Sequence, residues 1–328
     1  MTCDGCSISL AKAFEIFQND SETKSFLIKH GIRESLVKCN KCGADAYLTA
    51  DEKWWRCRKR QTKTVNKKVI KSQCDFKQSV RTNTWLQGTK LQLEKSFLFA
   101  SLYLICNPPH EEFLMEELNM SSGTVCDWSQ YVREVLENWC LNESTHSLGG
   151  PGKIVEIDEP KFGKRKYNRG RIIDGQWIFG GFERDSKLIF LEKVDDQSAS
   201  TLLEIINRRI KPGTTIMSHC WKSYDCLAME GYKHLIVNHS MNFVDADTGA
   251  YTQNIERMWR DARGTIPKFG RRDYHMSGYI ADFLFRRAHP SHITRMHAFA
   301  NAVTEFHKDN WHNVQTFEYF FTLKKIMH

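Results

Sequence analysis

The sequence predicts an α/β fold in the second half of the chain, a mixed sheet with helices, preceded by a cysteine-rich module and a helical region. After a small, Gly-rich linker at 144–152, three strand-like runs, KIVEID, QWIFGGFE and KLIFLEKV, are separated by turn residues, which favours an antiparallel meander. Apolar spacing then predicts a helix over 198–210, strands in TTIMSHCW and KHLIVNHS, and a helix over 253–263. This order of elements is typical of a ribonuclease H-like fold.

The composition is that of a folded protein with a localised positive charge. The 328 residues are 41% hydrophobic and 26% charged, which excludes a disordered acidic or basic tail. The net charge is +8, yet residues 53–90 hold twelve Lys/Arg and one acid, a local net charge of +11 that leaves −3 for the remainder. Such a segment predicts a polyanion or a membrane surface as its partner. No apolar stretch approaches the roughly 20 residues that a membrane span requires, and the N-terminus lacks a signal-peptide pattern.

Four of the eleven cysteines have a spacing that predicts a structural zinc ribbon. Cys39 and Cys42, in CNKC, form a knuckle that presents two thiolates on one turn, and Gly43 after them suits a positive φ. Cys57 and Cys74 would close a tetrahedral Zn²⁺ site from a returning hairpin, with the basic segment between them as an excursion. The alternative is that Cys57 and Cys74 are ordinary thiols.

The remaining cysteines predict no site. The odd total and the spacing do not suit a disulfide scaffold, which favours an intracellular, reducing environment. We expect Cys3 and Cys6, in TCDGC, to be free thiols near a frayed terminus. Cys106, Cys126 and Cys140 lie in apolar helical sequence and are expected to pack in the core.

These patterns divide the chain into five segments. The predicted segments are an N-terminal helical segment at 1–37, the ribbon at 38–80, a helical region at 81–143, the α/β domain at 150–300 and a C-terminal helical tail at 301–328. Within the helical region, a helix ending near Asn119 and a second helix capped by Ser121 or Ser122 predict a helix-turn-helix unit. A plain helical hairpin fits the same pattern.

Two acids are placed where they could carry chemistry. Asp158 ends the apolar strand IVEID, and a buried ionised acid is costly unless it is paired or binds a metal. Glu256 lies in TQNIERMWRDAR, on a helical face shared with Arg260 and Arg263. The alternative for Glu256 is a solvated helical salt bridge to Arg260.

Five long motifs carry a family resemblance. They are QSVRTNTWLQGTK, IDEPKFGKRKYNRGR, WIFGGFER, CWKSYDCL and VNHSMNFVDADTGAYTQNIERMWR, within a stretch from about Cys39 to His289. This stretch resembles the Merlin-type cut-and-paste transposases and their bacterial insertion-sequence relatives. The resemblance implies a zinc-binding and helix-turn-helix region that recognises transposon ends, followed by a ribonuclease H-like DDE catalytic domain.

Carried over residue by residue, the resemblance implies that Asp158 and Glu256 hold two Mg²⁺ or Mn²⁺ ions for phosphodiester hydrolysis and strand transfer. Family members have their second catalytic Asp just before a Cys-Trp pair, where this chain has His219. An imidazole suits zinc and can bind manganese, but it is a poor replacement for a bridging carboxylate. Three interpretations of His219 follow: loss of cleavage, weak activity that favours manganese, or replacement of the missing acid by Asp225 after a local shift.

Basic residues in two places predict contacts to the DNA backbone. The turn at 161–171 holds six Lys/Arg and no acid; a solvated hairpin tip is the alternative. Asn238 and His239 match the family run VNHS, and we expect these two residues and Arg260 to support the active site. The alternative for Asn238 and His239 is hydrogen bonding at a strand end. The predicted DNA-binding residues are Arg58, Lys59, Arg60, Lys63, Lys67, Lys68, Lys71, Arg81, Lys164, Arg165, Lys166 and Arg169.

The sequence therefore predicts a DNA transposase that acts on double-stranded DNA, both terminal inverted repeats and target DNA, as a homodimer or larger assembly without a membrane partner. The main alternative is a catalytically inactive, transposase-derived DNA-binding protein, which His219 favours. A zinc-dependent RNA-binding or structural protein is a third class, supported only by the basic charge. We expect the nucleus as the location for a eukaryotic element, and the cytoplasm or nucleoid for a bacterial one.

Overall fold

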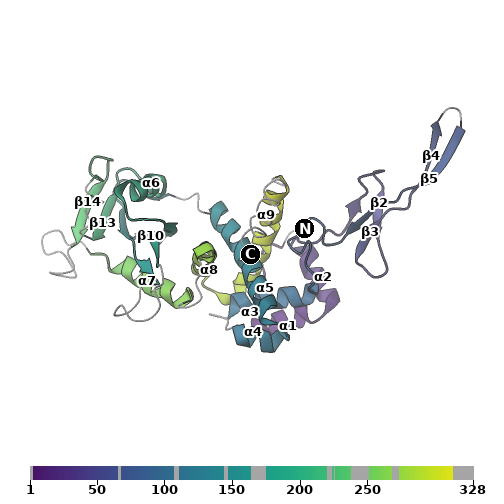
Figure 1. Cartoon of the computed structure of the whole chain (residues 1–328), viewed down its shortest axis with the longest axis horizontal. Coiled ribbons are helices and arrows are strands. Elements are labelled where there is room, and N and C mark those ends of the chain that lie inside the picture. The colour runs from purple at the N-terminus through teal and green to yellow at the C-terminus, as the bar shows by residue number, and fades with distance from the viewer. Residues whose placement is uncertain are drawn as a thin grey trace. The chain divides into compact units, whose positions relative to one another are not determined.

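The chain forms two units in the computed structural model, which describes residues 3–65, 68–106, 111–143, 147–163, 175–219, 224, 226–237, 251–267 and 273–312 (Figure 1). One unit comprises residues 1–135 together with 289–328, and the other comprises residues 136–288. The second unit is thus inserted between two segments of the first. The sequence predicted an α/β domain at 150–300 and a separate C-terminal tail, whereas the structure ends the second unit at Ala288.

Aromatic packing explains why the C-terminal helix belongs to the first unit. The helices of the first unit are α1 (Leu10–Phe17), α2 (Asp20–Lys29), α3 (Leu93–Ile105), α4 (Glu111–Leu118), the start of α5 (Ser122–Glu143), a short 3-10 turn η4 (His292–Thr294) and α9 (Arg295–His312). The Trp85 ring lies 5.4 to 5.9 Å from the rings of Phe97 on α3, Trp128 on α5 and Phe299 on α9. Phe97 and Phe299 are fully buried.

Among the described helices, none is long and apolar enough to cross a membrane.

The turn between α4 and α5 forms where the sequence predicts it. Asn119 follows α4 with φ +45°, a left-handed conformation that ends helices. The Ser121 hydroxyl accepts a hydrogen bond of 3.3 Å from the Thr124 backbone N–H, as the N-cap of a helix does.

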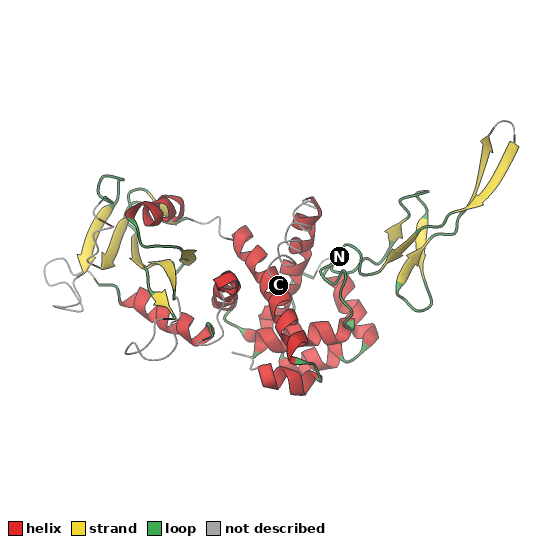
Figure 2. Cartoon of the chain, viewed as in Figure 1, coloured by secondary structure: helices red, strands yellow, loops and turns green. Residues whose placement is uncertain are grey.

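A small antiparallel sheet carries the cysteine-rich module. Its strands, in the order β1-β2-β3-β6, are β1 (Val37–Lys38), β2 (Asp45–Leu48), β3 (Trp54–Arg56) and β6 (Lys77–Ser79). Between β3 and β6 the chain forms a separate two-stranded hairpin, β4 (Arg60–Val65) and β5 (Lys68–Gln73), seen as two paired arrows in Figure 2. The basic excursion expected between Cys57 and Cys74 is therefore a β-hairpin.

The second unit is built on a mixed sheet with the order β11-β10-β8-β13-β14. These strands are β8 (Ile154–Asp158), β10 (Gln176–Glu183), β11 (Ile189–Val194), β13 (Thr215–His219) and β14 (Lys233–Val237), each within three residues of its predicted limits. β10 pairs antiparallel with β8 and β11, whereas β13 pairs parallel with β8 and β14. Three two-residue strands add short pairings: β9 (Lys161–Phe162) pairs with β10, and β7 (Leu148–Gly149) pairs with β12 (Ile210–Lys211).

Helices cover both faces of this sheet, in the three-layer arrangement visible in Figure 1. α6 (Ala199–Arg209) packs on one face with Val155 and Ile157 of β8. α7 (Gln253–Thr265) and α8 (Met276–Ala288), which follows the 3-10 turn η3 (Asp273–His275), pack on the other face. Because side chains alternate along a strand, Glu156 and Asp158 belong to the α7 face.

Candidate functional site

The ends of two neighbouring parallel strands bring Asp158 and His219 together. Asp158 is the last residue of β8 and His219 the last residue of β13. The His219 Nε2 atom lies 3.9 Å from the Asp158 Oδ1 atom, and both side chains are half-buried. His219 therefore stands beside the predicted catalytic acid, at the position where the family resemblance places a second carboxylate.

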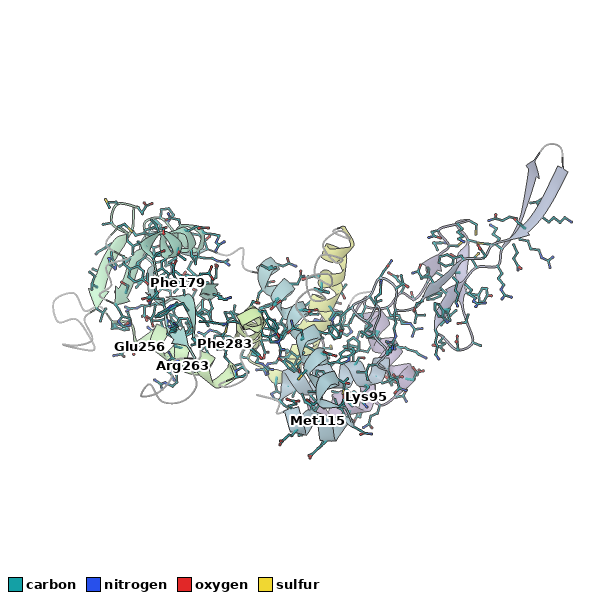
Figure 3. The ribbon with its side chains drawn as sticks, viewed as in Figure 1. Lys95, Met115, Phe179, Glu256, Arg263 and Phe283 are labelled. Atoms are coloured by element: carbon teal, nitrogen blue, oxygen red, sulfur yellow. The ribbon has the colours of Figure 1, made fainter. Side chains whose placement is uncertain are left out.

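Glu256 on α7 lines the same pocket as Asp158. A pocket of about 430 Å³ is lined by Asp158, Glu256, Trp259, Arg260 and Arg263. The last four residues recur at helical spacing on one face of α7. Figure 3 labels Glu256 and Arg263 on this helix. The structure thus gathers the two predicted acids and the predicted support residue Arg260 around one pocket, with two guanidinium groups beside the carboxylates.

A buried acid that the sequence analysis missed anchors this helix. Glu156 on β8 is fully buried, and its carboxylate accepts hydrogen bonds of 2.7 Å from Asn254 Nδ2 and 3.0 Å from the Ile255 backbone N–H. It also pairs with Arg184 at 2.7 Å. A carboxylate at a helix N-terminus satisfies backbone donors and interacts favourably with the helix dipole. The strand that carries Asp158 therefore fixes the helix that carries Glu256.

Electrostatics make the ionised form of Asp158 costly without a countercharge. Burial raises the pKa of Asp158, the nearby His219 opposes that rise, and the Glu256 carboxylate adds to it. Two carboxylates on one pocket repel each other, and oxygen donors are the ligands that Mg²⁺ prefers. Asp158 and Glu256 thus fit a divalent cation, whereas His219 contributes a nitrogen donor in place of an oxygen.

A second buried acid lies on the opposite face of the strand end. Burial raises the pKa of Glu159 to about 7, although a hydrogen bond donated by the Tyr224 hydroxyl acts in the other direction. The Gln197 side-chain amide lies 3.4 Å from Glu159 Oε1. Tyr224 is itself almost fully buried, so this group is part of the sheet-to-α6 packing and not of the pocket.

Gly180 leaves room for Trp259, one of the residues that line the pocket. It pairs in register with Asp158 across β8 and β10. A Cβ atom at this position would lie 2.8 Å from the Trp259 ring and 2.7 Å from Leu191. Only glycine leaves the Trp259 indole room to lie over the sheet beside the acid.

The four predicted zinc-ligand cysteines converge in the first unit. All four sulfur atoms lie within 4.8 Å of one another. Cys39 and Cys74 approach to 3.5 Å, as do Cys42 and Cys57. Gly43 has φ +69°, as the knuckle requires. The four thiols form a compact donor set of the kind that holds tetrahedral zinc, which argues against Cys57 and Cys74 as unrelated thiols.

The predicted DNA-binding residues fall into three groups. Arg58, Lys59, Arg60 and Lys71 are exposed on or next to the β4–β5 hairpin. Arg81 is used inside the fold, because its guanidinium donates to the carbonyl oxygens of Thr89 and Leu91, each at 2.7 Å. The third group, outside the described part of the chain or with side chains outside it, is Lys63, Lys67, Lys68, Lys164, Arg165, Lys166 and Arg169. Asp225, Asn238 and His239, which were predicted for the active site, also lie outside the described residues.

Comparison with protein families finds a match within the second unit. Residues 148–288 match the family model of the ISXO2-like transposase domain. The matched segment contains β8, β13, α7 and the whole lining of the pocket.

Two curated relatives match parts of the chain. An uncharacterized transposase-like protein of Haemophilus influenzae is 30% identical over 81 residues, which cover 25% of this chain and 64% of that protein. Male abnormal protein mab-31 of Caenorhabditis elegans is 26% identical over 172 residues, which cover 48% of this chain and 38% of that protein. The chain thus spans less than two thirds of the length of either relative.

Similarity to solved structures is weak. One of the similar structures is the simian T-cell lymphotropic virus intasome in complex with the PP2A regulatory subunit B56 gamma, with 12% sequence identity over 60% of this chain and 69% of that chain. The TM-score of 0.28 is too low to indicate a shared fold.

Proposed function

We propose that this chain, whose residues 148–288 match the ISXO2-like transposase domain, is a cut-and-paste DNA transposase that acts on transposon ends and target DNA. The observation that carries the proposal is the meeting of Asp158 from β8 and Glu256 from α7 at one pocket inside that domain. The strand order β11-β10-β8-β13-β14, antiparallel up to β8 and parallel after it, supports a ribonuclease H-like classification of the sheet.

The pocket residues have separate tasks in this proposal. Asp158 and Glu256 hold two Mg²⁺ or Mn²⁺ ions, which when bound would activate water and stabilise the leaving oxygen of a phosphodiester. Arg260 and Arg263, on the same face of α7, attract the phosphate backbone and orient it against the carboxylates. Glu156 keeps α7 in register with β8, so the two acids stay at the spacing the reaction needs.

DNA contact outside the pocket is assigned to the cysteine-rich module. Zinc held by Cys39, Cys42, Cys57 and Cys74 would fix the base of the β4–β5 hairpin, whose exposed Lys and Arg neutralise phosphates. The α4–α5 pair is a weaker candidate, because residues 111–130 hold five acids and no Lys or Arg. A surface of that charge repels the DNA backbone.

A second candidate function rests on His219. Its imidazole lies 3.9 Å from the carboxylate of Asp158, so a nitrogen donor stands where the cation site would need a second carboxylate oxygen. The chain would then be a transposase-derived protein that binds DNA without cutting it. For either function, we propose that the chain assembles as a homodimer or a larger complex. For a eukaryotic element, the proposed location is the nucleus.

Cleavage and binding assays on the full chain separate the two functions. Labelled duplexes carrying the DNA that flanks the gene are incubated with the protein and Mg²⁺ or Mn²⁺, and with the His219→Asp variant. Metal-dependent cuts by the unmodified chain that Asp158→Asn and Glu256→Gln abolish support the transposase. Cleavage only after His219→Asp, with equal DNA binding before and after, supports the inactive protein. The control is Asp185→Asn, which removes an exposed acid paired with Lys153. Cleavage that survives Asp158→Asn would overturn the assignment of the pocket.

A further inference from the structure

A second group of metal-binding side chains lies in the first unit, away from the four-cysteine module. Cys3, Cys6, His30 and His297 each offer a donor atom, and these four atoms lie within 4.8 Å of one another. The Cys6 sulfur is 3.5 Å from His30 Nε2 and 3.4 Å from His297 Nδ1. We propose that Cys3, Cys6, His30 and His297 form a second structural zinc site, with two thiolates and two imidazoles as ligands.

The distances match what a tetrahedral zinc ion requires. Zn–S bonds of about 2.3 Å and Zn–N bonds of about 2.0 to 2.1 Å at tetrahedral angles place sulfur and nitrogen ligands about 3.6 Å apart. Both measured S···N separations at Cys6 lie within 0.2 Å of that value. Cys3 and Cys6 also have the C-x-x-C spacing of a knuckle, with Gly5 between them at φ +149°.

Neighbouring groups prepare each histidine for a metal. The His30 Nδ1 atom lies 2.8 Å from the Phe26 carbonyl oxygen, so Nδ1–H donates there and Nε2 keeps its lone pair. The structure places the Asn301 Nδ2 atom 3.2 Å from His297 Nε2, one turn along α9. In the proposed site this amide is turned over by 180°, so that its oxygen accepts from Nε2–H and leaves Nδ1 as the ligand. Metal-bound histidines typically donate their second nitrogen in this way.

The surrounding packing holds the ligands in place whether or not they bind zinc. His30 is 4% exposed, and its ring packs against Phe26 with centroids 4.0 Å apart. The Thr304 hydroxyl of α9 donates to the His30 carbonyl oxygen at 2.9 Å. The Ile8 backbone N–H donates to the Ile293 carbonyl oxygen at 2.6 Å, so the N-terminal segment runs beside the start of α9.

The site would join the two chain segments that make up the first unit. Its ligands come from the N-terminal segment, from the end of α2 and from the first turn of α9, which returns after residues 136–288. A metal that crosslinks residues 3 and 297 restricts the unfolded chain over a very long loop and so stabilises the folded unit. Cys3 and Cys6 are therefore ligands in this proposal and not the free thiols that the sequence suggested.

Zinc counting on the full-length protein tests the site directly. The protein is purified under reducing conditions, dialysed against metal-free buffer, and its zinc measured by mass spectrometry. The unmodified chain is expected to hold about two zinc ions, one for each tetrahedral site. Cys6→Ser and His297→Gln should each hold about one, and the control Cys126→Ser, at an exposed cysteine outside both clusters, should still hold about two.

A conservative variant guards against simple unfolding. His297→Cys keeps a zinc ligand at the same position, so it should retain about two zinc ions while His297→Gln retains one. Cobalt substituted for zinc should give a two-thiolate spectrum that Cys6→Ser removes and Cys42→Ser leaves in place. Zinc content unchanged by both Cys6→Ser and His297→Gln would overturn the proposal. The count needs no DNA cleavage, so its result is independent of the proposed transposase activity.

Discussion

The carboxylate of Glu156, in the middle of β8, accepts a hydrogen bond of 3.0 Å from the backbone N–H of Ile255, in the first turn of α7. The two residues are 99 positions apart, and each lies within two residues of a predicted catalytic acid on its own element. Glu156 precedes Asp158 by two residues on the same face of β8, and Ile255 precedes Glu256 directly. The buried Glu156 carboxylate, which also accepts a hydrogen bond from Asn254 Nδ2, therefore sets the register between the two acids.

Replacing this carboxylate should loosen the second unit measurably. Glu156→Gln keeps the shape but removes the charge that pairs with Arg184, whose side chain is only 14% exposed. Breaking a buried ion pair on one side costs about 3 kcal/mol or more in free energy of unfolding. Thermal unfolding of the full chain should show a lower midpoint for the transition of this unit. The control Asp185→Asn breaks the exposed pair with Lys153 and should cost less than about 1 kcal/mol; equal losses in both variants would contradict the role of Glu156.

Local pattern predicted most of the second unit. The strand limits follow from apolar runs bounded by turn residues, and Asp158 could be placed at a strand end for the same reason. Cys74 could be named as the fourth ligand because only one cysteine remained near the other three. These inferences need no knowledge of which distant segments meet.

Contacts between distant segments could not be predicted in the same way. Glu156 lies in the run IVEID, but its partners Arg184 and Ile255 are 28 and 99 residues away. Cys6 meets His297 across 291 residues, so the C-x-x-C spacing of TCDGC does not show which histidines complete the ligand set. In the sequence, Arg81 is indistinguishable from the other basic residues of the positive segment. In the structure, its guanidinium donates hydrogen bonds to two backbone carbonyl oxygens. Charge and spacing show which groups are present, and only the fold shows which partners they meet.

Gly180 offers a test of how tightly Trp259 fits beside Asp158. In Gly180→Ala, the new Cβ would meet the Trp259 ring at 2.8 Å and Leu191 at 2.7 Å, closer than such atoms pack. We expect a loss of about 1 to 3 kcal/mol in free energy of unfolding, as for other overpacked sites. The control is Gly264→Ala near the end of α7, where a Cβ meets nothing within 4 Å. It should gain up to about 1 kcal/mol, because alanine is the better helix former. Urea unfolding of both variants distinguishes these outcomes, and an unchanged midpoint for Gly180→Ala would show that Trp259 moves freely.

The raised pKa of Glu159 predicts a pH-dependent stability. Its pKa moves from 4.5 to about 7 on folding, so between these values the folded chain keeps a proton that the unfolded chain has released. The free energy of unfolding therefore falls as pH rises from 4.5 to 7, by up to about 3 kcal/mol for this group. Glu159→Gln has no proton to lose at this position, so relative to the unmodified chain it should become more stable by that amount between pH 5 and pH 8. The comparison is made by urea unfolding at each pH without added Mg²⁺ or Mn²⁺. A stability difference between the two chains that stays constant with pH would contradict the buried, protonated carboxyl.

The β4–β5 hairpin should determine how steeply DNA binding depends on salt. Arg60 and Lys71 are exposed on its two strands, and each phosphate contact contributes about 0.9 to the slope of log affinity against log salt concentration. Replacing both by Gln should lower that slope by about 2 and weaken binding to all duplex sequences alike, since backbone contacts carry no base preference. The matched control replaces Lys12 and Lys187, two exposed lysines outside the cysteine-rich module, by Gln. Because the control removes the same charge, equal changes of slope in the two double variants would mean that the chain binds DNA through its net charge alone. A change confined to the hairpin variant, measured by fluorescence anisotropy over a series of salt concentrations, would locate the phosphate contacts on β4 and β5.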